Sequence, residues 1–238
     1  MWSKGVENES PLVRDYLKSC HDYHVEEAFE GELLSVEAIS HKRQLQPLGL
    51  LSRILFSKDP IVEMGSCFPY PHPLKERIIE KVRAAHEVLG FTDGPTHTEV
   101  IVNSQGEIEI IDFNPRFVGA DVLQSINNAY GIKIEETLFQ YAIGRDSVAT
   151  PRVHQFSCIQ YVLPPEISEF QSIEFPKHPE VKFQASFLKP GAKIQSIDRQ
   201  LDYLGCYLTV MPTFDMAIKR SKELRQEVIV NNQYQGTY

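Results

Sequence analysis

The sequence has few cysteines, no long apolar run and no excess of basic residues. Its four cysteines are scattered along 238 residues without a Cys-x-x-Cys spacing, so we predict free thiols and no structural zinc. No apolar run approaches the roughly 20 residues of a membrane helix, which argues against a membrane partner. The N-terminal segment MWSKGVENES has no apolar signal-peptide core, so we expect a cytoplasmic location. The formal net charge of −8 offers no basic face for nucleic acid.

What is present is an ordinary globular composition, with 42% hydrophobic and 24% charged residues. The length suits one large domain or two small ones. Periodicity and capping signals predict helices over residues 10–20, 73–89, 120–130, 133–143 and 214–227. They predict strands over residues 23–30, 33–40, 44–56, 61–65, 154–163, 181–188 and 206–212. This pattern predicts an α+β fold, an antiparallel sheet with flanking helices. A polar connection divides it into residues 1–148 and a small α/β lobe, residues 149–238.

The most informative stretch is a predicted β-hairpin over residues 96–113. It consists of the alternating segment THTEVIVN, a tight turn and the isoleucine-rich segment EIEIIDF. A two-residue loop ending at Gly106 would place Glu99 directly opposite Asp112, and a loop one residue earlier would shift that pairing by two residues. Either register leaves both carboxylates on one face, because side chains along a strand alternate with a period of two.

The end of this hairpin gathers groups that suit a cation and a phosphate. A proline stops the second strand just after Asp112 and Asn114, and Arg116 then projects from the turn. Facing carboxylates about 5 Å apart repel each other unless a cation lies between them. Oxygen ligands hold Mg²⁺, and an arginine supplies a bidentate donor for phosphate. His97 shares the face of Glu99 and would either orient that carboxylate or be a packed or solvated histidine. The alternative for the whole cluster is a solvated polar face.

The segment from Asp112 to Arg116, DFNPR, resembles the E-x-N-P-R element of the ATP-grasp superfamily. Glu99 stands where that family places its first metal carboxylate. Other segments follow in the family's order. VEEAFEG with LSVE resembles the hinge strand that holds adenine and the strand after it, and IVEMG resembles the substrate-side segment of the carboxylate–amine ligases. The resemblance covers residues 3–145 and implies the C-terminal portion of an ATP-grasp domain, followed by the small lobe.

The resemblance implies ATP and Mg²⁺ (or Mn²⁺) as cofactors. It implies three metal ligands: Glu99, Asp112 and Asn114. It implies four ATP-binding residues: Lys4, Glu26, Glu27 and Phe29. Arg116 would be catalytic, by stabilising the transferred phosphate, and Glu63 would face the acceptor substrate. The implied enzyme is an ATP-dependent carboxylate–amine ligase that forms a C–N bond through an acyl phosphate, with small-molecule acid and amine substrates.

The sequence departs from the family pattern at three places. Asp112 replaces the commoner glutamate, and Leu33 stands where the family often has a ribose-binding glutamate. The largest departure is that the family's N-terminal domain and most of its first ATP-grasp subdomain have no counterpart before Ser3. We therefore expect the C-terminal half of an ATP-grasp protein, with either a separate N-terminal half or a second copy of the chain as partner.

Two rival hypotheses follow from the same residues. The chain would be a non-catalytic truncated or split half that acts as a binding or partner module, or it would be a fragment of a biotin-dependent carboxylase. Against the second, Arg116 is followed by Phe-Val-Gly-Ala-Asp, where that branch usually has a Gln-Val-Glu-His type of stretch.

Overall fold

The computed structural model describes residues 25, 27–56, 59–145, 152–165, 169–194 and 203–234. The chain divides into two compact units, Met1–Glu30 and Gly31–Tyr238. In the first unit the described residues carry no regular secondary structure, which differs from the strand predicted over residues 23–30. Apolar alternation alone does not make a strand, because a strand also needs a hydrogen-bonded neighbour. The predicted helix over residues 10–20 lies outside the described residues.

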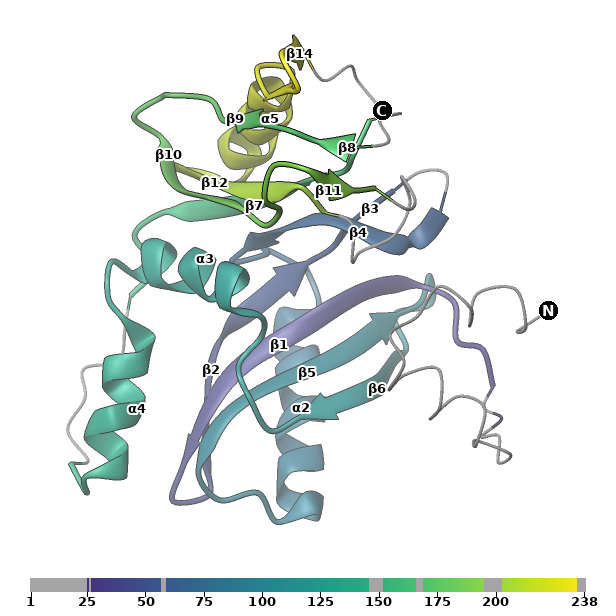
Figure 1. Ribbon diagram of the computed structural model, residues 1–238. Coiled ribbons are helices and arrows are strands. Elements are labelled where there is room, and N and C mark those ends of the chain that lie inside the picture. The colour runs from purple at the N-terminus through teal and green to yellow at the C-terminus, as the bar shows by residue number, and fades with distance from the viewer. Residues whose placement is uncertain are drawn as a thin grey trace, which may run out of the picture. The chain divides into compact units, whose positions relative to one another are not determined.

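The second unit contains a four-stranded antiparallel sheet, here called sheet A, which includes the predicted hairpin (Figure 1). Its strands, in spatial order, are β2 (Gln44–Ser52), β1 (Glu32–His41), β5 (Gly94–Val102) and β6 (Ile108–Asn114). Helix α2 (Lys75–Leu89) packs Ile78 and Val82 against the buried aliphatic residues of β1 and β5. One face of sheet A is therefore apolar, and the alternation of the strands leaves the opposite face to the hairpin's polar side chains.

A five-stranded antiparallel sheet, here called sheet B, joins strands that are distant in the sequence. Its strands, in spatial order, are β10 (Val181–Ser186), β12 (Gly205–Met211), β7 (Phe156–Val162), β4 (Asp59–Phe68) and β3 (Ile54–Phe56). Helix α3 (Ala120–Tyr130) packs on the side of Ile159, and α5 (Phe214–Arg225) packs on the side of Cys158. The boundary near residue 148 stays a prediction, and sheet B contains strands from both sides of it.

Smaller elements complete the second unit. They are α4 (Ile134–Ala142), the pair β8 (Glu169–Phe170) and β11 (Ala192–Lys193), and the trio β9 (Ile173–Glu174), β13 (Ile229–Val230) and β14 (Gln233–Tyr234). The α+β class predicted from the sequence is confirmed, and the predicted helices after residue 70 agree with the structure within a few residues. None of the described helices is long and apolar enough to cross a membrane. The cytoplasmic location stays a prediction.

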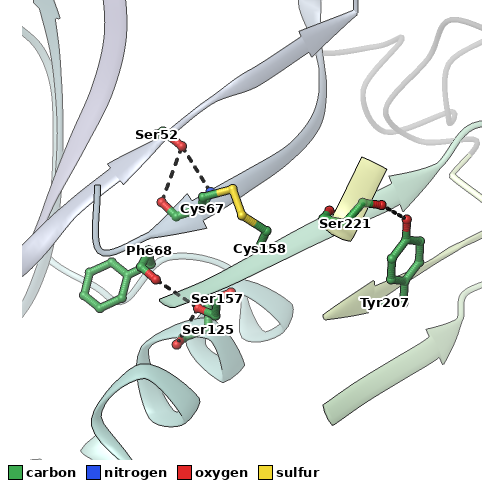
Figure 2. The surroundings of a disulfide bond; sticks show 8 residues. All are labelled: Ser52, Cys67, Phe68, Ser125, Ser157, Cys158, Tyr207 and Ser221. Atoms are coloured by element: carbon green, nitrogen blue, oxygen red, sulfur yellow. Dashed lines mark hydrogen bonds between the residues drawn. A yellow bond between two sulfur atoms is a disulfide. The ribbon is translucent and has the colours of Figure 1, made fainter. Parts of the chain in front are cut away.

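Figure 2 shows a disulfide bond between Cys67 and Cys158, which lie directly opposite each other in β4 and β7. Both cysteines are fully buried, and Ala217 of α5 packs beside them. The prediction of free thiols is therefore wrong for this pair. The two residues are 91 positions apart, and only the pairing of their strands brings the sulfurs together. Cys206 is a free thiol, and it is buried.

Candidate functional site

The hairpin of β5 and β6 brings the two predicted metal carboxylates onto one face, because Glu99 pairs directly with Asp112. Near the turn, Val102 pairs with Ile108. Continued without interruption, that register would set Glu99 opposite Ile111 and would turn Asp112 to the other face. A β-bulge next to Glu99 adds one residue to β6 and restores the shared face. The predicted facing pair thus forms, but through a bulge that the sequence pattern did not indicate.

The turn of this hairpin is longer than predicted, so the prediction of a two-residue loop is wrong. It spans residues 103–107, between the ends of β5 and β6. The side-chain oxygen of Asn103 accepts hydrogen bonds from the backbone N–H groups of Gln105 and Glu107, at 3.0 and 2.9 Å. Gly106 has a φ of +77°, which a glycine adopts without strain. An asparagine side chain can close a turn in this way, and here it stabilises the wider loop.

Behind Glu99 lies a chain of buried ionisable side chains. Glu37 of β1 is 0% exposed; its Oε1 accepts a hydrogen bond from Ser35 at 2.8 Å and lies 2.6 Å from Nδ1 of His97. The other ring nitrogen of His97 lies 3.3 Å from Oε1 of Glu99. Burial by itself would lower the pKa of His97, but its hydrogen bonds to both carboxylates raise that pKa to about 9. His97 in turn lowers the pKa of Glu99 to about 2, so Glu99 is ionised at neutral pH.

Arg53 completes this network from the short link between β2 and β3. Its guanidinium donates to Oε1 of Glu99 at 2.7 Å and to Oε1 of Glu63 at 3.4 Å. Burial raises the pKa of Glu63, and the positive charge of Arg53 opposes that shift. The structure therefore brings the predicted substrate residue Glu63 to the same guanidinium that holds the predicted metal ligand Glu99. Sequence reasoning missed Arg53, because the segment around it is irregular and shows no periodicity.

The other predicted residues of this hairpin lie at its exposed end. The side-chain amide of Asn114 donates to Oδ2 of Asp112 at 2.6 Å, so these two predicted ligands are adjacent. Arg116 is exposed, and its guanidinium donates to the carbonyl of Phe117 at 3.0 Å. Within the described residues no ion pair joins Arg116 to Asp112 or to Glu99. The catalytic role of Arg116 stays a prediction.

The predicted ATP-binding residues belong to the first compact unit, Met1–Glu30. Glu27 is exposed and Phe29 is half-buried. Glu26 and Lys4 lie outside the described residues. Because this unit is described by itself, an adenine or phosphate contact of these residues stays a prediction.

The oxygen atoms of the hairpin suit a hard divalent cation. Glu99 contacts Arg53 and His97 through the same oxygen, Oε1, and Asp112 is exposed directly opposite. In the part of the chain that the structure describes, no group of three acidic, histidine or cysteine side chains could hold a metal by itself. Mg²⁺ usually needs no such group, because it binds one or two carboxylates together with water and substrate phosphates. These residues therefore fit a cation that arrives with a nucleotide.

Comparison with known proteins assigns this arrangement to a family. Residues 8–120, which include both β1 and the Glu99–Asp112 hairpin, match the family model described as ATP-grasp domain. This part of the chain is an ATP-grasp domain. Over 141 residues the chain is 25% identical to the alanine–anticapsin ligase of Bacillus amyloliquefaciens. That match covers 57% of this chain and 29% of the relative.

Solved structures share the ATP-grasp fold over most of this chain. The L-amino acid ligase from Bacillus licheniformis superposes with a TM-score of 0.73 at 23% identity, over 87% of this chain and 55% of that one. The phosphoribosylglycinamide synthetase from Anaerococcus prevotii gives 0.71 at 16% identity, over 86% and 54%. A biotin carboxylase from Campylobacter jejuni gives 0.64 at 14% identity, over 84% and 46%. These identities establish the fold alone, and the chain spans about half the length of these solved relatives.

Proposed function

We propose that this ATP-grasp chain acts in an ATP-dependent carboxylate–amine ligase and carries its cation site and its acceptor site. The observation that carries the proposal is the direct pairing of Glu99 with Asp112 on one face of sheet A, with Asn114 beside them. The family match supports ATP as a cofactor. Relatives named as ligases support C–N bond formation.

In this proposal Glu99, Asp112 and Asn114 hold Mg²⁺ or Mn²⁺, which supplies positive charge against the phosphate oxygens of ATP. The contacts of His97 and Arg53 with Glu99 keep that carboxylate ionised and fix its position. A ligand held by neighbouring hydrogen bonds needs no reorganisation when the cation binds. Four further residues are proposed to contact ATP: Lys4, Glu26, Glu27 and Phe29.

The proposed reaction has two steps on a small carboxylic or amino acid and an amine. A carboxylate oxygen attacks the terminal phosphorus of ATP, the bond to the leaving oxygen of ADP breaks, and an acyl phosphate forms. The amine then attacks the carbonyl carbon, the C–N bond forms, and inorganic phosphate leaves while the amine loses a proton to solvent. Arg116 would bind the phosphoryl oxygens through its planar guanidinium. Glu63 would face the amine substrate.

Isothermal titration of the full chain with Mg·ATP tests the cation site. We expect binding by the wild type and at least about tenfold weaker binding by Asp112→Asn, because the exchange removes one ligand charge. Glu109→Gln is the matched control, since Glu109 is an exposed carboxylate of the same strand that pairs with Lys81 of α2 at 3.0 Å. The proposal fails if the wild type binds no nucleotide either alone or together with an N-terminal ATP-grasp half.

A second candidate function is a non-catalytic partner module. The observation that favours it is the placement of Arg116, whose guanidinium donates to the carbonyl of Phe117 and, within the described residues, forms no ion pair with Asp112 or Glu99. A module of this kind would work with a separate N-terminal half or with a second copy of the chain. Phosphate release measured with and without an added N-terminal half separates the two functions. Phosphate release by this chain alone would exclude the module.

A further inference from the structure

Arg53 occupies an unusual place in the topology, because it is the single residue between a strand of sheet A and a strand of sheet B. Strand β2 ends at Ser52 in sheet A, and β3 begins at Ile54 in sheet B (Figure 1). The side chain of Arg53 is only 7% exposed. A buried guanidinium is costly unless carboxylates surround it. The link between the two sheets is therefore stable only if carboxylates compensate the buried charge of Arg53.

The two carboxylates that Arg53 contacts lie on different sheets. One guanidinium nitrogen donates to Glu99 of β5 in sheet A at 2.7 Å, and another donates to Glu63 of β4 in sheet B at 3.4 Å. The register of β3 and β4 shifts between Gly65 and Glu63, and such an irregularity changes the direction of a side chain. Arg53 is thus shared unequally, with the shorter contact to Glu99.

We infer that Arg53 is a positioning residue through which the cation site at Glu99 and the acceptor site at Glu63 influence each other. The inference rests on the proposed function for the identity of both sites. A divalent cation at Glu99 repels the guanidinium and favours its contact with Glu63. Neutralising Glu63 has the opposite effect, because Glu99 is then the remaining charged carboxylate partner of Arg53. The guanidinium therefore competes with the cation for Glu99. Because thermodynamic linkage is reciprocal, a ligand at Glu63 changes the affinity of the cation site by the same factor by which the cation changes the affinity of the acceptor site.

Mn²⁺ titration of the full chain, without and with ATP present, tests this coupling. We expect Glu63→Gln to weaken Mn²⁺ binding about fivefold, although Glu63 is not a proposed ligand. In an Arg53→Gln background the same exchange should change the affinity less than about twofold. Arg53→Lys serves as a second background, because it keeps the charge but cannot hold two carboxylates with separate nitrogens. Glu109→Gln is the control in every background.

A measurement without any ligand keeps the inference separate from the proposed function. Urea denaturation measures the effects of Glu63→Gln and Glu99→Gln on the folding equilibrium constant. While Arg53 is present, the effect of the double variant should differ from the product of the two single effects by a factor of about three or more. In the Arg53→Gln and Arg53→Lys backgrounds, the two effects should be additive within about twofold. If Mn²⁺ binds but neither measurement depends on Arg53, the inference is overturned and the proposed cation site stands. If Mn²⁺ binds to the wild type neither alone nor in the presence of ATP, both the cation site and its coupling are overturned.

Discussion

Sheet A and sheet B bury polar groups of different kinds. In the described part of sheet A and its helix α2, the buried side chains include three that can carry charge: Glu37, His86 and His97. In sheet B, among the residues whose burial the structure describes, the buried polar side chains are neutral: Ser66, Ser157, Gln160 and Thr209. A buried ionisable group costs free energy unless it is paired, whereas a neutral one needs only a hydrogen bond.

The two sheets are also held together differently. In sheet A, Glu37 and His97 contact each other in a network that ends at Glu99, the proposed metal ligand. Sheet B has a disulfide between β4 and β7, and next to it Ser157 Oγ lies 3.2 Å from the carbonyl of Phe68 and 2.9 Å from that of Ser125 (Figure 2). The proposed cation site at Glu99 therefore belongs to the sheet with buried ionisable groups, while sheet B contributes the proposed acceptor residue Glu63 from β4.

Breaking the ionic network of sheet A should have the largest effect on stability. Glu37→Ala removes the buried partner of His97, and we expect a loss of about 3 to 5 kcal/mol in the free energy of unfolding. Urea denaturation measures this loss. Glu32→Ala is the matched control on the same strand, because Glu32 is exposed, and it should cost less than about 1 kcal/mol. Equal losses for both variants would contradict the comparison of the sheets.

Removing the covalent link of sheet B should have the next largest effect. We expect the double variant Cys67→Ala and Cys158→Ala to lose about 2 to 4 kcal/mol, because the bond closes a long loop in the unfolded chain. A reducing agent should destabilise the wild type to a similar extent and should leave the double variant unchanged. Thermal denaturation with and without reductant makes this comparison. Insensitivity of the wild type to reductant, with free thiols detected on unfolding, would argue against the bond.

His86 allows a pH test of the apolar side of sheet A. It lies 3.2 Å from the hydroxyls of Ser40 and Thr96, and burial lowers its pKa. A lowered pKa means that the neutral form stabilises the fold. This contribution is complete above the unfolded pKa of about 6.5 and is lost as the pH falls. The wild type should therefore lose more stability than His86→Gln between pH 7.5 and 5.5, by at most about 1.4 kcal/mol per pH unit. Parallel pH profiles would refute this.

The smallest effect is expected at a neutral buried group of sheet B. The hydroxyl of Ser66 is buried and has no hydrogen-bond partner within the described residues, so Ser66→Ala should change the free energy of unfolding by less than about 1 kcal/mol. Ser157→Ala is the paired comparison and should cost about 1 to 2 kcal/mol, because its hydroxyl contacts two buried carbonyls. Calorimetry or urea denaturation ranks the two variants by their loss in free energy of unfolding, and a reversed order would disagree with this structure.

The sequence predicted the parts of the site that depend on local periodicity. Alternation along β5 and β6 placed Glu99 and Asp112 on one face, and the proline after Asn114 marked the end of the strand. The same reasoning failed for the turn, because the side chain of Asn103 closes a wider loop and a bulge then corrects the register. A period of two predicts a face, but it cannot count an inserted residue.

The amino-acid sequence by itself determined the α+β class, the helices of the second unit and the polar face of the hairpin, since each of these follows from contacts between near neighbours. Only the tertiary structure decided that Cys67 meets Cys158 and that Arg53 reaches both Glu63 and Glu99. The disulfide and the Arg53–Glu99 contact join residues that are 91 and 46 positions apart in the chain. They exist because antiparallel strands from separate segments pair in one register, and no local pattern specifies that register.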